Sequence, residues 1–358
     1  MAESSRPIRV GLVGYGFAGK TFHAPLIGAV PGLSLVAVCS SDSAKVRADL
    51  PHVEVIADAV ALATSSAIDL VVIASPNDSH VPLARAALSA QRHVVVDKPF
   101  TLSLADARAL TALAETQHRL LSVFHNRRWD SDFLSIRQAI TQGLIGTVAH
   151  FESHFDRFRP QVRRRWREGA GLGSGILFDL GPHLVDQAIQ LFGVPNRVLA
   201  SLALQRHGAL SDDWAHLVLE YGPRRVILHA GMLVAGGVPR FAVHGNEGSL
   251  IKRKSDPQEA QLLSGMKPLA EGWGVDTDDV VRYDGGGGER LIPASRGDQS
   301  QYYAGIHAAL CGAAPNPVPP LQALAVVAVI EAAMLSAQSG SAVEPDLTDD
   351  EHSALSRL

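Results

Sequence analysis

Residues 8–19 read IRVGLVGYGFAG, an apolar run that leads directly into Gly14-x-Gly16-x-x-Gly19. This spacing is typical of the turn between the first strand and the first helix of a dinucleotide-binding domain. Gly14 permits the tight turn, Gly16 lets a diphosphate approach the backbone, and Gly19 lets the helix pack close to the strand. A purely structural turn can carry the same glycines, so the interpretation depends on the segments that come after it in the chain.

Those segments alternate regularly between strand-like and helix-like patterns. The apolar runs at 33–40, 69–75, 93–97 and 120–125 are short, rich in Val, Ile and Leu, and bounded by turn residues. Alanine-rich segments with a helical period lie between several of them. Apolar strands separated by helices predict a parallel sheet covered on both faces. We therefore predict a doubly wound Rossmann domain over residues 1–125.

The pattern changes after residue 126. A helix over 130–142 leads into alternating segments with no helices between them, which predicts a large, mostly antiparallel sheet with one open face. We predict an α+β domain over 126–345, in which a helix over 320–338 closes the fold and packs back on the first domain, and a loose tail over 346–358. The segments expected to form the sheet are 148–155, 197–207, 214–221, 225–233 and 240–250, with a glycine-tipped hairpin at 281–291.

Composition narrows the class of protein. Lys and Arg number 32 against 36 Asp and Glu, a net charge of −4, which argues against nucleic-acid and anionic-membrane partners. The only cysteines, Cys39 and Cys311, favour a reducing cytoplasm and argue against a disulfide scaffold or a cysteine-rich metal site. The N-terminus MAESSRPIRV lacks a signal-peptide pattern, and the apolar run 321–330 ends at Glu331, short of a membrane span of about 18 residues.

The end of the second expected strand bears on the choice between NAD and NADP. A site for NAD places an Asp or Glu about 20 residues past the glycines, where it binds the ribose hydroxyls. Here residues 38–47 read VCSSDSAKVR, so that Ser40 and Ser41 are followed by Lys45. Small hydroxyls and a cation favour the 2′-phosphate of NADP. Asp42 keeps NAD open, unless it serves as the N-cap of the helix over 43–50.

Three further clusters lie at strand ends or helix starts. SPNDSH (75–80) and DKPF (97–100) lie where the third and fourth strands end, the edge at which ligands bind such sheets. Taken alone, SPNDSH is equally compatible with an ordinary loop in which Asn77 or Asp78 acts as a cap, and Lys98 is more simply explained as a surface lysine. In ILFDLGPHLVDQ (176–187), Asp179 and His183 share one helix face and form a candidate proton-transfer pair. A helix start beside a core histidine, or a metal site completed by Asp186, would give the same pattern; we expect no metal, because hydride transfer needs none.

Together these motifs resemble the Gfo/Idh/MocA oxidoreductase family over nearly the whole chain. The resemblance rests on the glycine turn, the Asp-Lys-Pro of 97–99 and the Asp-x3-His of 179–183. SVFHNRRWDSDF (122–133) and FESHFDRFRP (151–160) are similar to the branch that contains NADP-dependent scyllo-inositol dehydrogenases. The resemblance implies that Lys98, Asp179 and His183 form the catalytic group and that the Lys98–Pro99 bond is cis.

The motifs and the resemblance together give a set of cofactor-binding candidates. The resemblance adds Asn126 and Arg127, at the junction of the two domains, and Trp166 and Arg167, near the nicotinamide. The set is Gly14, Tyr15, Gly16, Phe17, Ala18, Gly19, Ser40, Ser41, Lys45, Ser75, Pro76, Asn77, His80, Asp97, Lys98, Pro99, Asn126, Arg127, Trp166 and Arg167.

The expected function is reversible hydride transfer between NADP(H), with NAD(H) as the alternative cofactor, and a secondary alcohol of a sugar or cyclitol. His183 would exchange the hydroxyl proton, Lys98 would hydrogen-bond the reacting oxygen, and Asp179 would orient the histidine. A non-catalytic NADP-binding sensor and a redox-neutral, NAD-dependent glycosidase remain alternatives on the same scaffold. By resemblance we expect a homodimer or a dimer of dimers, formed through the open sheet.

Two features keep more than one interpretation. Pro25 predicts a short or interrupted helix after Gly19, which would leave the segment 20–23 near the domain cleft and not buried under the sheet. His23 would then be either a cleft residue near substrate or a capping histidine with no chemical role. The arginine-rich segment 157–167 is expected to form a solvated loop with ion pairs.

Overall fold

The computed structural model describes residues 6–357. Residues 1–5, which belong to the N-terminus expected to lack a signal peptide, and Leu358 lie outside the described residues. The chain divides into two compact units. The first contains the described residues up to Asn126, together with Gln258–Trp273 and Asp298–Ala323. The second contains Arg127–Pro257, Gly274–Gly297 and the chain from Leu324 onward.

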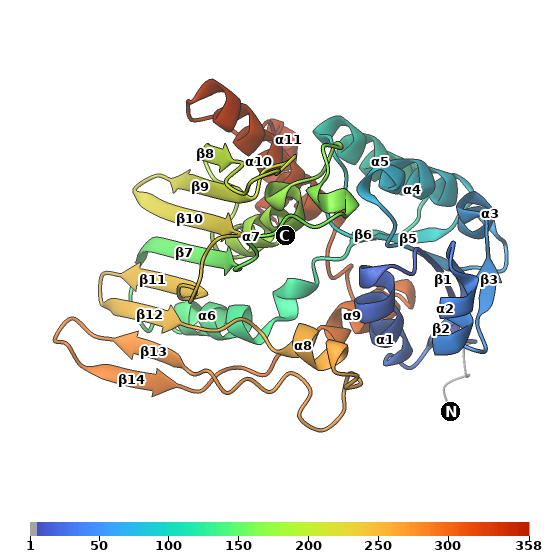
Figure 1. Cartoon of the computed structure of the whole chain (residues 1–358), viewed down its shortest axis with the longest axis horizontal. Coiled ribbons are helices and arrows are strands. Elements are labelled where there is room, and N and C mark those ends of the chain that lie inside the picture. Colours follow the sequence, from blue (N-terminus) through green and yellow to red (C-terminus); the bar gives the residue numbers. More distant parts are fainter. Residues whose placement is uncertain (1–5, 358) are drawn as a thin grey trace. The chain divides into compact units, whose positions relative to one another are not determined.

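The first unit is built on a parallel sheet of six strands in the order β3-β2-β1-β4-β5-β6. All of its strand pairs are parallel, and this order is that of a doubly wound nucleotide-binding fold, as predicted. The short β3, which the apolar pattern does not reveal, adds one strand to the five expected. The strands are β1 Ile8–Val13, β2 Leu33–Cys39, β3 Glu54–Ile56, β4 Leu70–Ile73, β5 His93–Val96 and β6 Leu121–Val123 (Figure 1).

Local signals in the sequence set the helix starts of this unit. Asp42 accepts a hydrogen bond from the Lys45 amide, and Ser103 accepts one from the Asp106 amide, so both act as N-caps. The segment after Gly19 forms one π-helical turn, Gly19–His23, before α1, which is the interruption that Pro25 predicts. The helices are α1 Ala24–Gly28, α2 Ser43–Asp49, α3 Ala59–Thr64, α4 His80–Ser89, α5 Leu104–Thr116, α8 Gln258–Leu263 and α9 Ser300–Leu310.

The second unit is built on an eight-stranded sheet in the order β14-β13-β12-β11-β7-β10-β9-β8. Every neighbouring pair is antiparallel except β7 and β10, so the prediction of a mostly antiparallel sheet is confirmed. The expected single strand over 240–250 is instead a hairpin. The strands are β7 Val148–Asp156, β8 Arg197–Ala203, β9 Trp214–Tyr221, β10 Arg224–Gly231, β11 Phe241–Gly245, β12 Gly248–Lys252, β13 Val280–Tyr283 and β14 Glu289–Ile292.

Helices cover one face of this sheet and form the core of the unit. They are α6 Ser131–Thr141, α7 Ile176–Phe192, α10 Pro320–Ser339 and α11 Asp349–Leu355. Among the described residues, α10 is the one helix long and apolar enough to cross a membrane, but 61% of its apolar window is buried. Its side chains Val326, Val329 and Ile330 belong to the core cluster, so α10 is a core helix.

The expectation of a loose tail is wrong. Thr348 and Glu351 form a reciprocal capping box that starts α11, and Leu347 and Leu355 pack against the core cluster.

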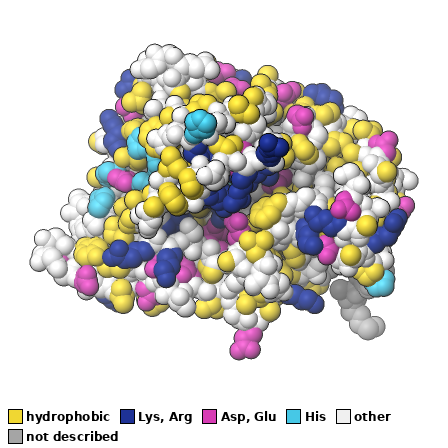
Figure 2. All heavy atoms as spheres, viewed as in Figure 1, with side chains coloured by type: hydrophobic (Ala, Val, Ile, Leu, Met, Phe, Trp, Pro, Cys, Tyr) yellow, Lys and Arg dark blue, Asp and Glu magenta, His cyan; other side chains and the backbone are white. Residues whose placement is uncertain are grey.

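The other face of the sheet carries half-exposed side chains. Along β9 the buried Ala215, Leu217 and Leu219 alternate with outward Trp214, His216 and Val218. Figure 2 shows histidine side chains gathered over the sheet strands at the left of the view. The outward face is therefore a mixture of aromatic, aliphatic and titratable groups.

Candidate functional site

The glycine turn of the first unit joins β1 to the helical segment after it. The Gly14 amide donates to the Cys39 carbonyl at 2.9 Å, and the Ala74 amide donates to the Val13 carbonyl at 2.8 Å. Gly14 has a φ of +100°, and a Cβ there would lie 2.5 Å from the Ala74 carbonyl oxygen. A Cβ at Gly19 would lie 2.1 Å from the Gly14 carbonyl oxygen. Packing within the chain itself therefore requires both of these glycines.

Gly16 differs from the other two. It is exposed, and a Cβ placed on it would meet no heavy atom within 4 Å. Nothing in the packing of the chain explains a glycine at this position, whereas a ligand lying against the backbone does. The turn therefore fits a dinucleotide diphosphate, which would approach the backbone at Gly16.

The residues flanking the glycines lie partly open. Phe17 is exposed and makes an edge contact with Phe22 at 5.8 Å between ring centroids, and Ala18 precedes the π-helical turn. Tyr15 is buried, and its carbonyl oxygen accepts a hydrogen bond from Lys45 Nζ at 3.1 Å. That bond ties α2 to the glycine turn.

In the segment after β2, Asp42 serves as a helix cap. Its carboxylate accepts the Lys45 amide at 3.0 Å, and its own amide donates to Ser40 Oγ at 3.1 Å. Asp42 is thus the N-cap of α2, which is the helix-capping alternative left open by the sequence. Ser41 is exposed beside it.

The loop after β4 is linked to the Asp-Lys-Pro segment after β5. The buried His80 ring lies between two carbonyl oxygens, with Nδ1 2.9 Å from that of Pro99 and Nε2 3.1 Å from that of Ser75. Burial lowers the pKa of His80, although the nearby Asp97 carboxylate opposes this. Of the other predicted residues in this loop, Asn77 is buried and Pro76 is exposed. The carboxyl ends of β1, β2, β4 and β5 thus gather the predicted residues of the first unit at one edge.

The Lys98–Pro99 peptide bond is cis, as the resemblance implies. Immediately before it, Asp97 is buried at the end of β5, where one carboxylate oxygen accepts the Lys98 amide at 2.8 Å. Burial raises the pKa of Asp97, but His23, Lys98 and His80 outweigh this and lower it to about 2. The carboxylate therefore stays ionised in all ordinary conditions.

The structure corrects both expectations for His23. The side chain is fully buried, so it does not remain outside the packed interior, and it makes no capping hydrogen bond at the start of α1. Its Nδ1 lies 2.6 Å from the Tyr303 hydroxyl, which α9 brings from the distant part of the first unit. Tyr303 was not indicated by any motif.

In the second unit, α7 carries Asp179 and His183. Gly175 precedes the helix with a φ of +97°, and a Cβ there would lie 2.0 Å from a carboxylate oxygen of Asp212. That carboxylate accepts the Leu177 amide at 2.7 Å, so a residue between β8 and β9 caps the helix. The glycine-rich segment and the distant cap fix the helix start, and so the position of Asp179 in the first turn.

Asp179 lies among arginines from the segment 157–167. Its carboxylate is 3.4 Å from Arg167 Nε and 4.0 Å from Arg157 Nη1. The Arg167 guanidinium also lies 4.5 Å from the centre of the exposed Trp166 ring. The expected ion pairs in this loop are present. One turn after Asp179, His183 is buried, with the Phe155 ring 6.5 Å from its own.

The next turn of α7 is held by buried ion pairs. Asp186 accepts hydrogen bonds from Nε and Nη2 of Arg128, the shortest at 2.6 Å, so this carboxylate forms a buried salt bridge. Gln187 donates to the Arg127 carbonyl and accepts from Arg240 Nη2 at 2.7 Å. Arg127 itself pairs with Asp130 at 3.0 Å. Among residues 6–357, no group of three His, Cys, Asp or Glu is arranged to hold a metal ion.

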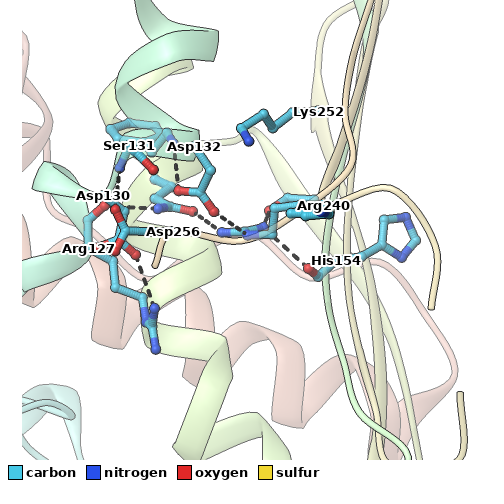
Figure 3. Close-up of polar contacts among 12 residues, drawn as sticks. Arg127, Asp130, Ser131, Asp132, His154, Arg240, Lys252 and Asp256 are labelled. Carbon is cyan, nitrogen blue, oxygen red and sulfur yellow. Dashed lines mark hydrogen bonds and ion pairs between the residues drawn. The ribbon is translucent and has the colours of Figure 1, made fainter. Parts of the chain in front are cut away.

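Arg240 is the centre of a polar layer that sequence reasoning missed. Figure 3 shows it between Asp132, which it contacts at 3.0 Å, and the backbone of His154. Its guanidinium is also 3.7 Å from the centre of the Phe155 ring, and burial lowers its pKa to about 10. Arg240 directly precedes β11, where an exposed arginine would look the same in the sequence, so no local signal marks it.

The fold and the glycine turn define a dinucleotide-binding protein, and comparison with known proteins gives its family. Residues 8–125 match the NAD-binding Rossmann fold of the Gfo/Idh/MocA oxidoreductase family, and residues 137–344 match its C-terminal alpha/beta domain. The chain belongs to the Gfo/Idh/MocA family of NAD(P)-binding oxidoreductases.

Individual relatives agree with this assignment. The uncharacterized oxidoreductase YdgJ of Escherichia coli is 53% identical over 92% of this chain and 96% of its own. The scyllo-inositol 2-dehydrogenase (NADP(+)) IolW of Bacillus subtilis is 36% identical over 92% and 94%. A Klebsiella pneumoniae protein assigned as an oxidoreductase has a crystal structure that matches with a TM-score of 0.94 and 56% identity over 99% of both chains.

Proposed function

We propose that this protein is an NADP(H)-dependent oxidoreductase that transfers hydride reversibly between nicotinamide and a CH–OH group of a sugar or cyclitol. The observation that carries the proposal is Gly16. It is open in the chain, while packing fixes the glycines on either side of it. The similarity to IolW supports an inositol-like substrate and NADP.

The preference for NADP over NAD rests on the end of β2. Asp42 is used as a helix cap, and Ser40, Ser41 and Lys45 supply hydroxyls and a cation next to it. These groups suit a 2′-phosphate, whereas a free carboxylate there would repel it. A ratio of dissociation constants measured for NADPH and NADH tests this preference directly.

We assign the chemical roles residue by residue. Bound nicotinamide supplies the hydride donor or acceptor. His183 takes the hydroxyl proton during oxidation and returns it during reduction. Lys98 donates a hydrogen bond to the reacting oxygen and stabilises its alkoxide character. Asp179, which is paired with Arg167, hydrogen-bonds a neighbouring hydroxyl of the substrate and orients His183.

The remaining cofactor contacts are also proposals. We assign Asn126, Arg127, Trp166 and Arg167 to the nicotinamide side, following the family resemblance. Trp166 is exposed, so its ring can cover a ligand, whereas Asn126 is buried, and its side-chain amide can donate or accept a hydrogen bond.

The decisive assay follows absorbance at 340 nm with inositol isomers and common aldoses, each with NADP and with NAD. Lys98→Ala and His183→Ala should each lose about 10²-fold or more of turnover while NADPH binding stays near normal. Lys267→Ala and His352→Ala, at exposed positions, are the matched controls. Full turnover in the Lys98 and His183 variants would refute the roles.

The same assay separates the alternatives. A sensor would bind NADPH without turnover on any polyol, and a redox-neutral glycosidase would retain NAD through purification and release sugar without net reduction. Retention of Lys98, Asp179 and His183 together supports turnover, since a sensor needs only the dinucleotide turn.

We further propose that the protein works in the cytoplasm as a homodimer or a dimer of dimers, joined through the outward face of its large sheet. Outward Val218 lies between Leu199 and Ile227 on neighbouring strands, which makes an apolar row on that face. Val218→Asp should therefore lower the mass measured by sedimentation equilibrium. An unchanged mass in a folded variant would place the interface elsewhere.

A further inference from the structure

A chain of three buried polar groups lies inside the first unit and takes no part in the roles assigned to Lys98, Asp179 and His183. It begins at the Tyr303 hydroxyl, 2.6 Å from His23 Nδ1. It continues from His23 Nε2 to a carboxylate oxygen of Asp97, 3.8 Å away. Tyr303 and His23 are fully buried, and Asp97 is nearly so.

Aromatic packing fixes the imidazole in this chain. The Phe124 ring lies 4.2 Å from the His23 ring between centroids, and the Tyr303 ring meets His23 edge-on at 6.1 Å. Tyr302 packs edge-on against Phe124 at 4.9 Å, but its hydroxyl donates to Ser122 instead of joining the chain. The ring of His23 therefore has little freedom to turn.

The surroundings of the imidazole decide which nitrogen carries the proton. Nε2 faces the Asp97 carboxylate at 3.8 Å, too far for a hydrogen bond, so this pairing is electrostatic. It favours the tautomer with hydrogen on Nε2, in which Nδ1 accepts from the tyrosine hydroxyl. Burial raises the pKa of Tyr303 well above its ordinary value, which keeps the hydroxyl proton available for that bond. The N–H dipole of His23 thus points at Asp97.

Asp97 is linked to the backbone of the next residue, Lys98, by a hydrogen bond. The carboxylate oxygen that does not face His23 accepts the Lys98 amide at 2.8 Å. The orientation of the carboxylate therefore fixes the backbone that carries the lysine side chain. Burial alone would raise the pKa of Asp97; His23, together with Lys98 and His80, brings it to about 2. Without His23, the buried carboxylate loses one of the groups that keep it ionised.

We propose that His23 is a positioning residue for hydride transfer: with Tyr303, it holds the Asp97 carboxylate ionised and oriented, and so sets the backbone of Lys98. The proposal rests on the function proposed above for Lys98. It also explains why a histidine comes after the glycine turn, at a position that the dinucleotide motif itself does not specify.

Neighbouring tyrosines provide a matched test. Tyr303→Phe and Tyr302→Phe each remove one buried hydroxyl from the same aromatic cluster, but only the first contacts His23. We expect Tyr303→Phe to lower kcat about tenfold with little change in the KM for NADP, and Tyr302→Phe to stay near wild type. Equal losses in the two variants would show a packing effect and overturn the proposal.

A titration tests the link to Asp97. His23→Leu should raise the pKa of Asp97, followed by the NMR signal of its carboxyl carbon, by about one pH unit or more, since the buried carboxylate then takes up a proton more easily. His23→Gln, which keeps an N–H donor, should give an intermediate shift. A folded His23→Leu variant with the wild-type kcat and the wild-type pKa of Asp97 would overturn the proposal.

Thermal unfolding provides a readout independent of turnover. His23→Leu should lower the unfolding midpoint less in an Asp97→Asn background than in wild type, because the two side chains act on each other. The excess loss should shrink only as the pH falls below about 4 toward 2, because wild type keeps the carboxylate ionised down to its pKa of about 2. Additive losses at every pH would overturn the proposal. Absence of NADP-linked turnover in wild type, with this coupling intact, would instead refute the proposed function.

Discussion

Gly19→Ala and Gly16→Ala should have opposite effects, which makes the dinucleotide turn a direct test of cofactor binding. The first should lower the stability of the fold, and the second should weaken the binding of NADPH. An added Cβ at Gly19 would lie 2.1 Å from the Gly14 carbonyl oxygen, about 1.3 Å inside the 3.4 Å at which ordinary contact begins. Because the close atom belongs to the backbone, the clash can be relieved only if the turn itself moves. Gly19→Ala should therefore lose about 1–3 kcal/mol of unfolding free energy, or more.

Gly16→Ala should leave the fold intact. No heavy atom lies within 4 Å of its Cβ position, so we expect the unfolding free energy to change by less than about 1 kcal/mol. The new methyl group would instead occupy space that the diphosphate needs. We expect NADPH to bind about tenfold more weakly, or worse, which corresponds to about 1.4 kcal/mol.

The assay pairs urea denaturation with a fluorescence titration of NADPH on the same preparations. Gly28→Ala is the matched control, because it too has no neighbour within 4 Å but lies at the end of α1, away from the turn. It should change neither quantity. NADPH binding of wild-type strength in Gly16→Ala would refute the reasoning that assigns this position to a ligand.

Three further predictions concern stability. Arg128→Met should cost about 3–5 kcal/mol by leaving the buried Asp186 carboxylate uncompensated, and adding Asp186→Leu should recover most of it in urea denaturation. Asp212→Ala should cost about 1–2 kcal/mol by removing the cap of α7, and an unchanged midpoint would contradict that role. His93 Nδ1 accepts a hydrogen bond from the Leu120 amide. Burial is the main cause that lowers the pKa of His93 to about 4. Because the unfolded chain takes up this proton near pH 6.5, stability should fall as the pH drops from about 6.5 to about 4. His93→Gln should flatten that slope in thermal unfolding measured across this range.

Much of the architecture follows from patterns that are local in the sequence. The apolar runs and helical periods predicted the parallel sheet, and Asp42 was recognisable as a helix cap. β3 was not predicted because Glu54–Ile56 is short and only partly buried, so it has no apolar run to mark it. The helix in the tail was not predicted because α11 is held by a capping box and two leucines, which are too few signals to distinguish it from a polar segment.

The candidate site divides in the same way. The glycine turn, the Asp-Lys-Pro segment and the Asp-x3-His pair were visible as motifs of adjacent residues. Arg240 was not, because the groups that make it important, Asp132 and Gln187, lie 108 and 53 residues away. The same holds for Tyr303, which meets His23 across 280 residues.

The sequence by itself determined that this protein has a dinucleotide turn on a parallel sheet, followed by a mostly antiparallel one. Hydrophobic period and glycine spacing are properties of neighbouring residues, and they need no knowledge of the path of the chain. Only the tertiary structure decided that Gly16 is open while Gly14 and Gly19 are closed, that Asp212 caps α7, that β7 and β10 run parallel, and that His23 is enclosed with Tyr303 and Asp97. Each of these depends on which distant segments pack together, because a cap, a ladder or a buried polar chain forms only when its separate parts are brought within hydrogen-bond or van der Waals distance.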